Sequence, residues 1–299
     1  MSCNSRLDHA FQDAPSLILA EDSKFILFSD CHRGTGTSND NFLKNQNPYF
    51  AALQHYYKEG YTYIELGDGD ELWENYTLSQ IIDLHSNVFW LLSKFYKEKR
   101  LYLLYGNHDM VKRSSLYTAR NLSAYHCSNR QECSPLFPGI RIHEGLILKD
   151  KKHIKDLYLT HGHQADLLNS TFWKLARFLV RYLWKPAEGF GLLDPTSAAK
   201  NNTHKKRTEE RLTQWACDNH RILVTGHTHR PMIGSPDSPY FNTGSCVHPR
   251  CITCIEVQNR CLTLVKWTTA TREDMTLYVA REELAGPVCI DDYSLEKFF

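Results

Sequence analysis

The amino-acid sequence predicts an α/β fold in which two β-sheets pack face to face and helices flank the pair. Short apolar runs rich in β-branched and aromatic residues alternate with longer helical patterns through most of the chain. A late group of strands then follows with no clear helix between its members. Because alternating helices cover the faces of a sheet, these patterns indicate a two-sheet sandwich with helices outside it.

Predicted strands and helices follow from the same patterns. Strands are expected at residues 25–28, 61–66, 101–105, 157–160 and 222–225, and later at 240–242, 252–257 and 262–267. The run 141–149, which Gly145 interrupts, indicates a hairpin or a bent strand. Helices are expected at residues 48–59 and 78–99.

Length and composition limit the class of protein. The chain has 299 residues, enough for one large domain, and we expect a single domain over residues 1–299. The formal net charge of +1 gives little support for a long basic track that would bind nucleic acid. The sequence shows neither a signal peptide nor the roughly 20 apolar residues that a membrane span needs. We therefore expect a cytoplasmic protein.

Polar side chains that can bind metals follow five of the predicted strands, at the point where each strand ends. The five segments are Ser29-Asp30-Cys31-His32, Gly67-Asp68-Gly69-Asp70-Glu71, Gly106-Asn107-His108-Asp109, His161-Gly162-His163 and Gly226-His227-Thr228-His229. Ligand sites of α/β sheets gather at the carboxyl ends of strands. Asp and Asn also start ordinary loops, but loop formation alone does not explain five such strand ends in succession. We therefore predict that these segments meet in one polar site.

The types of side chain indicate the chemistry of this site. Imidazole, carboxylate and amide groups without thiolate suit divalent ions such as Mn, Fe, Zn or Co. The set is too large for one ion, so two ions that share a carboxylate are expected, with manganese as the first choice. Two such ions lie roughly 3.5–4 Å apart and hold both oxygens of a displacement at phosphorus. The sequence thus predicts hydrolysis of a phosphate ester or phosphoanhydride.

The order of these motifs resembles the calcineurin-like metallophosphoesterase superfamily, over residues 30–229. The resemblance implies a four-layer αββα sandwich with a dinuclear metal site at one edge. It implies a first metal held by Asp30, His32, Asp68 and His229, and a second held by Asp68, Asn107, His161 and His227. Asp68 would bridge the two ions.

The same resemblance implies a mechanism in which a hydroxide that bridges the metals attacks phosphorus. His108 would contact the phosphate and donate a proton to the leaving oxygen. Asp109 is expected to orient His108 or to cap its turn, with metal binding as a further alternative. His163 is expected either to bind metal or to order the turn after His161.

The pattern Asp68-x-x-Glu71-x-Trp73 is similar to the bacterial UDP-diacylglucosamine hydrolases of lipid A synthesis. Those enzymes cleave a pyrophosphate bond in a lipid-linked nucleotide sugar. That group typically has arginine where this chain has His108, so the resemblance concerns the scaffold more than the substrate. We expect a small-molecule or lipid-linked phosphate as substrate. The alternatives are a nuclease or cyclic-nucleotide phosphodiesterase, and a non-catalytic binding module on the same scaffold.

A helical insertion is expected between Gln164 and Asn219, with helices at 166–184 and 205–219 and a Pro/Gly-rich break at 185–196. Both of its ends adjoin predicted metal ligands, so we expect it to cap the site and to allow peripheral membrane contact. Its first helix has apolar side chains beside a row of basic ones. These are Phe172, Trp173, Leu175, Phe178, Leu179, Tyr182 and Leu183, with Lys174, Arg177, Arg181 and Lys185. An ordinary helix with a solvated basic face is the alternative.

Ten cysteines are scattered along the chain, and in a reducing compartment we expect most of them to be thiols. The tightest group is Cys246, Cys251, Cys254 and Cys261, which contains one C-x-x-C pair. A structural zinc site there is one alternative. Buried thiols on a strand are the other, because residues 252–257 have a strand pattern.

Overall fold

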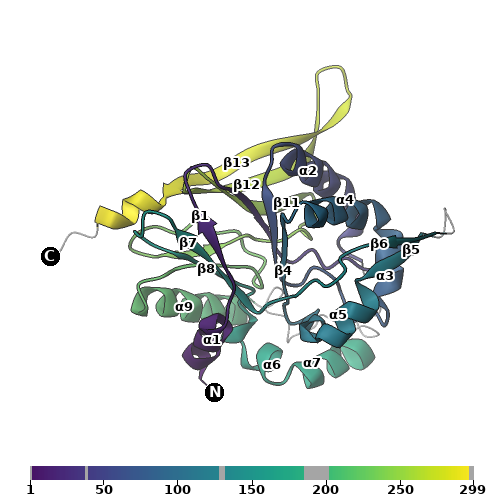
Figure 1. Ribbon diagram of the computed structural model, residues 1–299, viewed down its shortest axis with the longest axis horizontal. Coiled ribbons are helices and arrows are strands. Elements are labelled where there is room, and N and C mark those ends of the chain that lie inside the picture. Colours follow the sequence, from purple (N-terminus) through teal and green to yellow (C-terminus); the bar gives the residue numbers. More distant parts are fainter. Residues whose placement is uncertain (1, 38–39, 128–131, 185–201, 296–299) are drawn as a thin grey trace.

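The computed structural model describes residues 2–37, 40–127, 132–184 and 202–295. Two β-sheets pack face to face, and helices cover both outer faces (Figure 1). This arrangement confirms the predicted α/β sandwich.

The larger sheet has six strands in the order β13-β12-β11-β2-β3-β4. The strands β2, β3 and β4 are parallel, whereas β11, β12 and β13 join antiparallel on the far side of β2. The bounds are β2 (Lys24–Phe28), β3 (Thr62–Leu66), β4 (Leu101–Leu104), β11 (Cys251–Gln258), β12 (Cys261–Thr271) and β13 (Leu277–Cys289).

The smaller sheet has five strands in the order β1-β7-β8-β9-β10. Its neighbours are parallel except for the antiparallel pair of β7 and β8. The bounds are β1 (Ser16–Leu19), β7 (Gly145–Asp150), β8 (Leu157–Thr160), β9 (Ile222–Thr225) and β10 (Tyr240–Asn242). A separate ribbon consists of β5 (Ala124–Cys127) and β6 (Glu132–Pro135).

Two helices cover each outer face of the sandwich. The six-stranded sheet is covered by α2 (Gln46–Lys58) and α4 (Ser86–Lys97), and the five-stranded sheet by α1 (Cys3–Gln12) and α9 (Asn202–Asp218). Shorter helices are α3 (Leu78–Leu84), α5 (Ser115–Asn121), α6 (Leu167–Ser170) and α7 (Trp173–Leu179), with a π-helical turn η4 (Val180–Trp184). Helical turns are η1 (Leu43–Asn45), η2 (Met110–Arg113), η3 (His163–Ala165) and η5 (Ile290–Leu295). Among the described helices, none has the length and apolarity to cross a membrane.

Successive side chains of each strand point to opposite faces of the sheet, and this alternation gives the sandwich its layers. On β2, Phe25 and Leu27 pack between the two sheets, whereas Ile26 and Phe28 pack against the helices. On β9, Ile222 and Val224 face the other sheet, and Leu223 packs with α9. The strands that lead to the predicted site are largely buried, with partly buried residues at Tyr102 of β4 and Tyr158 of β8.

The structure confirms the five strands that lead to the predicted site. The helix expected at residues 78–99 is instead two helices that meet at His85. His85 leaves the helical conformation (φ −102°, ψ 33°), and its buried ring contacts the Gly34 carbonyl oxygen at 3.2 Å. The strand β13 has no counterpart in the sequence prediction, because its charged side chains hide the apolar alternation.

The two described parts of the expected insertion differ in position. The helix α9 packs on the five-stranded sheet, where Leu212 and Trp215 are fully buried beside Phe11 of α1. In contrast, α7 and η4 pack against the loop that follows β3. The break expected at 185–196, with Lys185, lies outside the described residues.

The cysteine prediction needs one correction. Cys261 is not a thiol but forms a disulfide with Cys289, because the pairing of β12 with β13 places these residues opposite each other. Cys246 and Cys254 are buried free thiols, and Cys251 is a partly buried one. No cysteine belongs to a metal-binding group within the part of the chain that the structure describes.

Candidate metal centre

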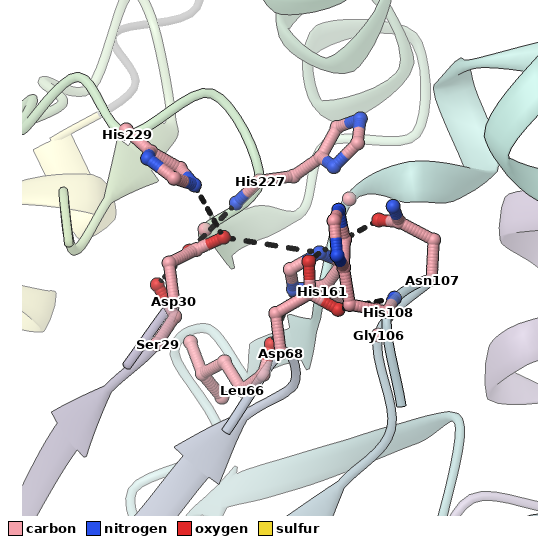
Figure 2. Close-up of polar contacts among 12 residues, drawn as sticks. Ser29, Asp30, Leu66, Asp68, Gly106, Asn107, His108, His161, His227 and His229 are labelled. Carbon is pink, nitrogen blue, oxygen red and sulfur yellow. Dashed lines mark hydrogen bonds and ion pairs between the residues drawn. The ribbon is translucent and has the colours of Figure 1, made fainter. Parts of the chain in front are cut away.

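The five predicted strand ends converge at one edge of the sandwich (Figure 2). Backbone hydrogen bonds link the loops in pairs: Asp30 N donates to Gly67 O at 3.1 Å, and Gly226 N donates to His161 O at 3.0 Å. The convergence brings together all seven residues that the sequence nominated as metal ligands. They are Asp30, His32, Asp68, Asn107, His161, His227 and His229.

One group of ligand atoms comes from Asp30, His32 and His229, which lie within 4.8 Å of one another. Asp30 Oδ1 is 3.1 Å from His229 Nε2. His32 Nε2 is 3.2 Å from His229 Nε2 and 3.8 Å from Asp30 Oδ1. Two imidazole nitrogens and a carboxylate oxygen therefore face one point.

A second group comes from Asp68, His161 and His227, again within 4.8 Å. Asp68 Oδ2 is 3.1 Å from His161 Nε2, and Asn107 Oδ1 is 3.2 Å from the same nitrogen. Asp68 Oδ2 is also 3.8 Å from His32 Nε2 in the first group. Asp68 thus lies between the two groups.

The backbone at these loops is unusual. Five of the seven residues have positive φ angles, which non-glycine residues rarely adopt. The residues are Asp30 (50°), His32 (46°), Asp68 (50°), His227 (68°) and His229 (56°). Such conformations cost of the order of 1–3 kcal/mol each and concentrate at functional sites, where the surrounding structure holds them in place.

Glycines allow the loops to approach closely. A side chain on Gly106 would collide with the Asp68 carboxylate, and one on Gly226 would collide with Ser29 and Asp30. The glycines beside the predicted ligands are therefore needed for space, so that the carboxylates after β2 and β3 can lie close to the loops after β4 and β9.

Hydrogen bonds orient each ligand so that one atom stays directed at the site. Asp30 Oδ2 accepts from Ser29 Oγ and from His227 N at 2.9 Å, which leaves Oδ1 for the site. Asp68 Oδ1 accepts from His108 N at 2.8 Å, which leaves Oδ2. His161 Nδ1 is 2.8 Å from Leu66 O, which fixes Nε2 toward the site.

The residues fit divalent metal ions. Among the described residues, the buried atoms Asp30 Oδ1 and His227 Nε2 make no hydrogen bond of good geometry, although His229 Nε2 lies 3.1 Å from the first and Asp166 Oδ2 3.7 Å from the second. Buried polar atoms are nearly always paired, so two unpaired atoms at one place need an explanation. Two ions, one at each ligand group, would supply it, and the oxygen and nitrogen ligands match Mn, Fe, Zn or Co.

Charge on the ligands depends on their neighbours. Burial alone would raise the pKa of Asp68, but the charged forms of His161 and His108 lower it well below its ordinary range. Burial opposes protonation of His161, yet Asp68 and Asp30 raise its pKa to about 9. The metal-free centre therefore contains ionised carboxylates with a protonated imidazole, and this proton must leave when a metal binds.

His108 has two partners whose roles the sequence interpretation missed. Its Nδ1 is 2.9 Å from Glu71 Oε1, and Glu71 Oε2 is 2.9 Å from Nδ1 of His32. The Trp73 ring stacks on the His108 ring, with centroids 4.2 Å apart and planes at 22°. Glu71 and Trp73 follow Asp68 by three and five residues, a spacing that the sequence showed without revealing these contacts.

Asp109 supports the backbone of the site. It accepts hydrogen bonds from Gly106 N at 2.7 Å, from Gly69 N at 3.2 Å and from Lys112 Nζ at 2.7 Å. Within the described residues, no hydrogen bond joins it to the His108 ring. Of the expected roles for Asp109, the contacts favour the cap of the turn.

His163 lies in the wall of the site, with its ring centroid 5.5 Å from that of His161. It belongs to neither ligand group among the described residues, and its buried Nδ1 has no hydrogen-bond partner there. Burial and the neighbours His161 and His227 lower the pKa of His163 well below its ordinary value. A neutral ring therefore borders the site.

The chain belongs to the calcineurin-like phosphoesterase family, whose model matches residues 23–231. The protein is accordingly a metal-dependent phosphoester hydrolase. The matched segment contains all seven nominated ligands, but it does not identify the UDP-diacylglucosamine hydrolase branch, which stays a prediction.

Two solved structures of a cold-active protein tyrosine phosphatase are also similar to this chain. One has 14% identity and a TM-score of 0.40, and covers 95% of this chain and 82% of its own. The other, a point mutant, has 15% identity and a TM-score of 0.39, with 91% and 82% covered. Likeness at this level identifies no shared substrate. No curated protein matches the sequence.

Proposed function

We propose that the protein is a dinuclear phosphohydrolase that cleaves a phosphomonoester or pyrophosphate bond. The observation that carries this proposal is the position of Asp68 Oδ2, 3.1 Å from His161 Nε2 and 3.8 Å from His32 Nε2. A carboxylate between two ligand groups suits two ions, for which manganese is our first choice. The first ion would take Asp30, His32, Asp68 and His229, and the second Asp68, Asn107, His161 and His227.

When bound, the two ions would supply Lewis acidity toward the phosphoryl oxygens and would acidify the attacking water. His108 would act beside them. Glu71 holds its Nδ1, which leaves Nε2 for the substrate. Burial opposes protonation of His108, but Glu71 and Asp68 raise its pKa. Its ring would therefore keep a second proton, which it can donate to the leaving oxygen.

For the substrate we propose a phosphate attached to a lipid or to a nucleotide. The side chains of the first insertion helix support this proposal. Cations surround the Trp173 ring, with Arg177 at 5.2 Å, Arg113 at 5.8 Å and Lys174 at 6.0 Å from its centroid. Beside them, Leu175 is 52% exposed and Phe178 is 57% exposed. A basic aromatic surface with apolar neighbours suits an anionic group on an apolar or ring-shaped body.

For the location we propose the cytoplasm, with peripheral membrane contact through the same helix. Phe172 and Tyr182 add to its exposed apolar surface. Basic residues beside exposed apolar ones are typical of helices that lie on an anionic membrane.

The experiment is a substrate panel with the Mn²⁺-loaded protein. It contains p-nitrophenyl phosphate, bis-p-nitrophenyl phosphate, a nucleoside diphosphate linked to a lipid, and single-stranded DNA. Turnover of the monoester or pyrophosphate is the expected result. Preferred turnover of the diester or DNA would replace the proposal with the phosphodiesterase alternative. Two bound metals without any turnover would favour the non-catalytic module.

A further inference from the structure

Arg181 of η4 holds the loop that follows β3. Its Nε donates to Trp73 O at 2.7 Å, and its Nη2 donates to Leu72 O at 2.8 Å and Asn75 O at 3.1 Å. The guanidinium also lies 4.3 Å from the centroid of the Tyr76 ring. A planar guanidinium can bind several carbonyl oxygens at once, which a single ammonium group cannot do as well. Arg181 therefore fixes the backbone of residues 72–75.

This loop carries the ring that stacks on His108. One neighbour of Trp73 is the His108 ring, and the insertion helix supplies two more, Ala176 and Val180. Trp73 is only 3% exposed, and its Nε1 has no hydrogen-bond partner among the described residues. Because no hydrogen bond from the described residues holds the indole, the position of this ring depends on its packing and on its backbone.

The basic row of the insertion helix thus divides into two roles. Arg177 lies over Trp173, at 5.2 Å from the ring centroid, and belongs to the surface proposed for the substrate. Arg181 instead points to the carbonyl oxygens of residues 72, 73 and 75. The Arg181 side chain therefore binds the protein backbone and does not belong to the surface around Trp173.

We propose that Arg181 is a positioning residue for His108. It holds the backbone of residues 72–75, and so keeps Trp73 against the His108 ring. The contact between η4 and this loop thereby sets the orientation of His108, the proposed catalytic acid. This inference rests on the proposed function, because it assumes that His108 acts on the substrate.

The first test compares Arg181→Ala with Lys206→Ala, in full-length protein on p-nitrophenyl phosphate. Lys206 lies in the same insertion, and its side chain is 77% exposed and paired with Glu210. Arg181→Ala should lower kcat about 10-fold or more, because small misplacements near a reacting group are costly. KM should stay within about twofold and metal content should not change, whereas Lys206→Ala should match the wild type.

Arg181→Lys should recover part of the lost kcat, since an ammonium group can replace only some of the hydrogen bonds. Wild-type kcat in Arg181→Ala would overturn the proposal. A fall in kcat that matches a loss of bound metal would also overturn it, because Arg181 would then support the ligands and not His108.

The second test needs no activity. In the metal-free protein, the stacked Trp73 ring should shift the NMR signals of the His108 ring protons. Arg181→Ala should move these signals toward those of Trp73→Leu, in which the stacking ring is absent, and Lys206→Ala should not. Unchanged signals in a folded Arg181→Ala protein would overturn the proposal. A wild type with two metals and no turnover would contradict only the proposed function, because the NMR result would still test the positioning role.

Discussion

The loops at the strand ends and the helix α7 with η4 meet at the same place but are built differently. The loop ligands Asp30, Asp68 and His161 are at most 1% exposed, and hydrogen bonds with backbone groups of neighbouring segments hold them. In contrast, Leu175 and Phe178 on α7 are more than half exposed. The comparison separates a buried set of candidate metal ligands on the sandwich from an exposed segment, for which we propose contact with the substrate through α7 and support of His108 through Arg181 of η4.

Substitution of His108, at the rim of the strand-end loops, should have the largest effect on kcat. We expect His108→Ala to keep the fold and the metals and to lower kcat by about 10²–10⁴-fold, the usual contribution of a general acid or base. The loss should be greater for phenyl phosphate than for p-nitrophenyl phosphate, because poor leaving groups need the proton. Equal losses of kcat on both esters would mean that His108 stabilises charge and does not donate a proton.

A smaller effect is expected at Glu71, which contacts both His32 and His108. Glu71→Gln keeps the size of the side chain but removes its charge. We expect a loss of about 10–100-fold in metal affinity or activity, as for other residues that orient metal ligands. Metal titration and kinetics on the same preparation measure both quantities. Wild-type values for both would show that the two histidines are oriented without this carboxylate.

A substitution in the insertion is expected to have a still smaller effect, on KM and not on kcat. Arg177→Ala should raise KM for the physiological substrate roughly 5-fold, as expected for one exposed charged contact worth about 1 kcal/mol. Kinetics on p-nitrophenyl phosphate should not change, because that ester lacks the group that Arg177 would contact. Equal effects on both substrates would mean that Arg177, like Arg181, supports the reaction site and does not select the substrate.

The smallest expected effect is the release of a proton when the metal binds. The pKa of His161 is raised to about 9 in the metal-free protein, and a metal binds only the neutral ring. Metal uptake at pH 7 should therefore release a proton from this residue, and affinity should rise with pH until about pH 9. Calorimetry in buffers of different ionisation enthalpy measures the release. Metal affinity that falls as pH rises from 6 to 9 would contradict the charge assignment.

Much of the site could be predicted because its residues follow strands with simple patterns. Asp30 follows an apolar run after one serine, and Asp68 and Asn107 each follow the glycine that ends such a run. A parallel arrangement of such strands places their ends together whatever the details of the loops. The fold class followed from the same patterns.

The rest of the site depends on side-chain directions that sequence spacing does not reveal. Glu71 reaches two histidines only because the loop after β3 turns back over the site. Arg181 has the spacing of Arg177 and Lys174 but turns to the backbone of that loop. The contacts of Glu71 span 39 and 37 residues, and that of Arg181 with Trp73 spans 108. Local sequence patterns therefore could not predict either role.

The measurement that tests the central claim most directly is the metal content of the wild type and of Asp68→Asn. Elemental analysis would follow reconstitution with Mn²⁺ or Zn²⁺, with the exposed Asp22→Asn as control. We predict two metals per chain in the wild type and in the control. Asp68→Asn should weaken both sites, because it removes the carboxylate that lies between the two ligand groups. One metal or fewer per wild-type chain after reconstitution would contradict the dinuclear centre.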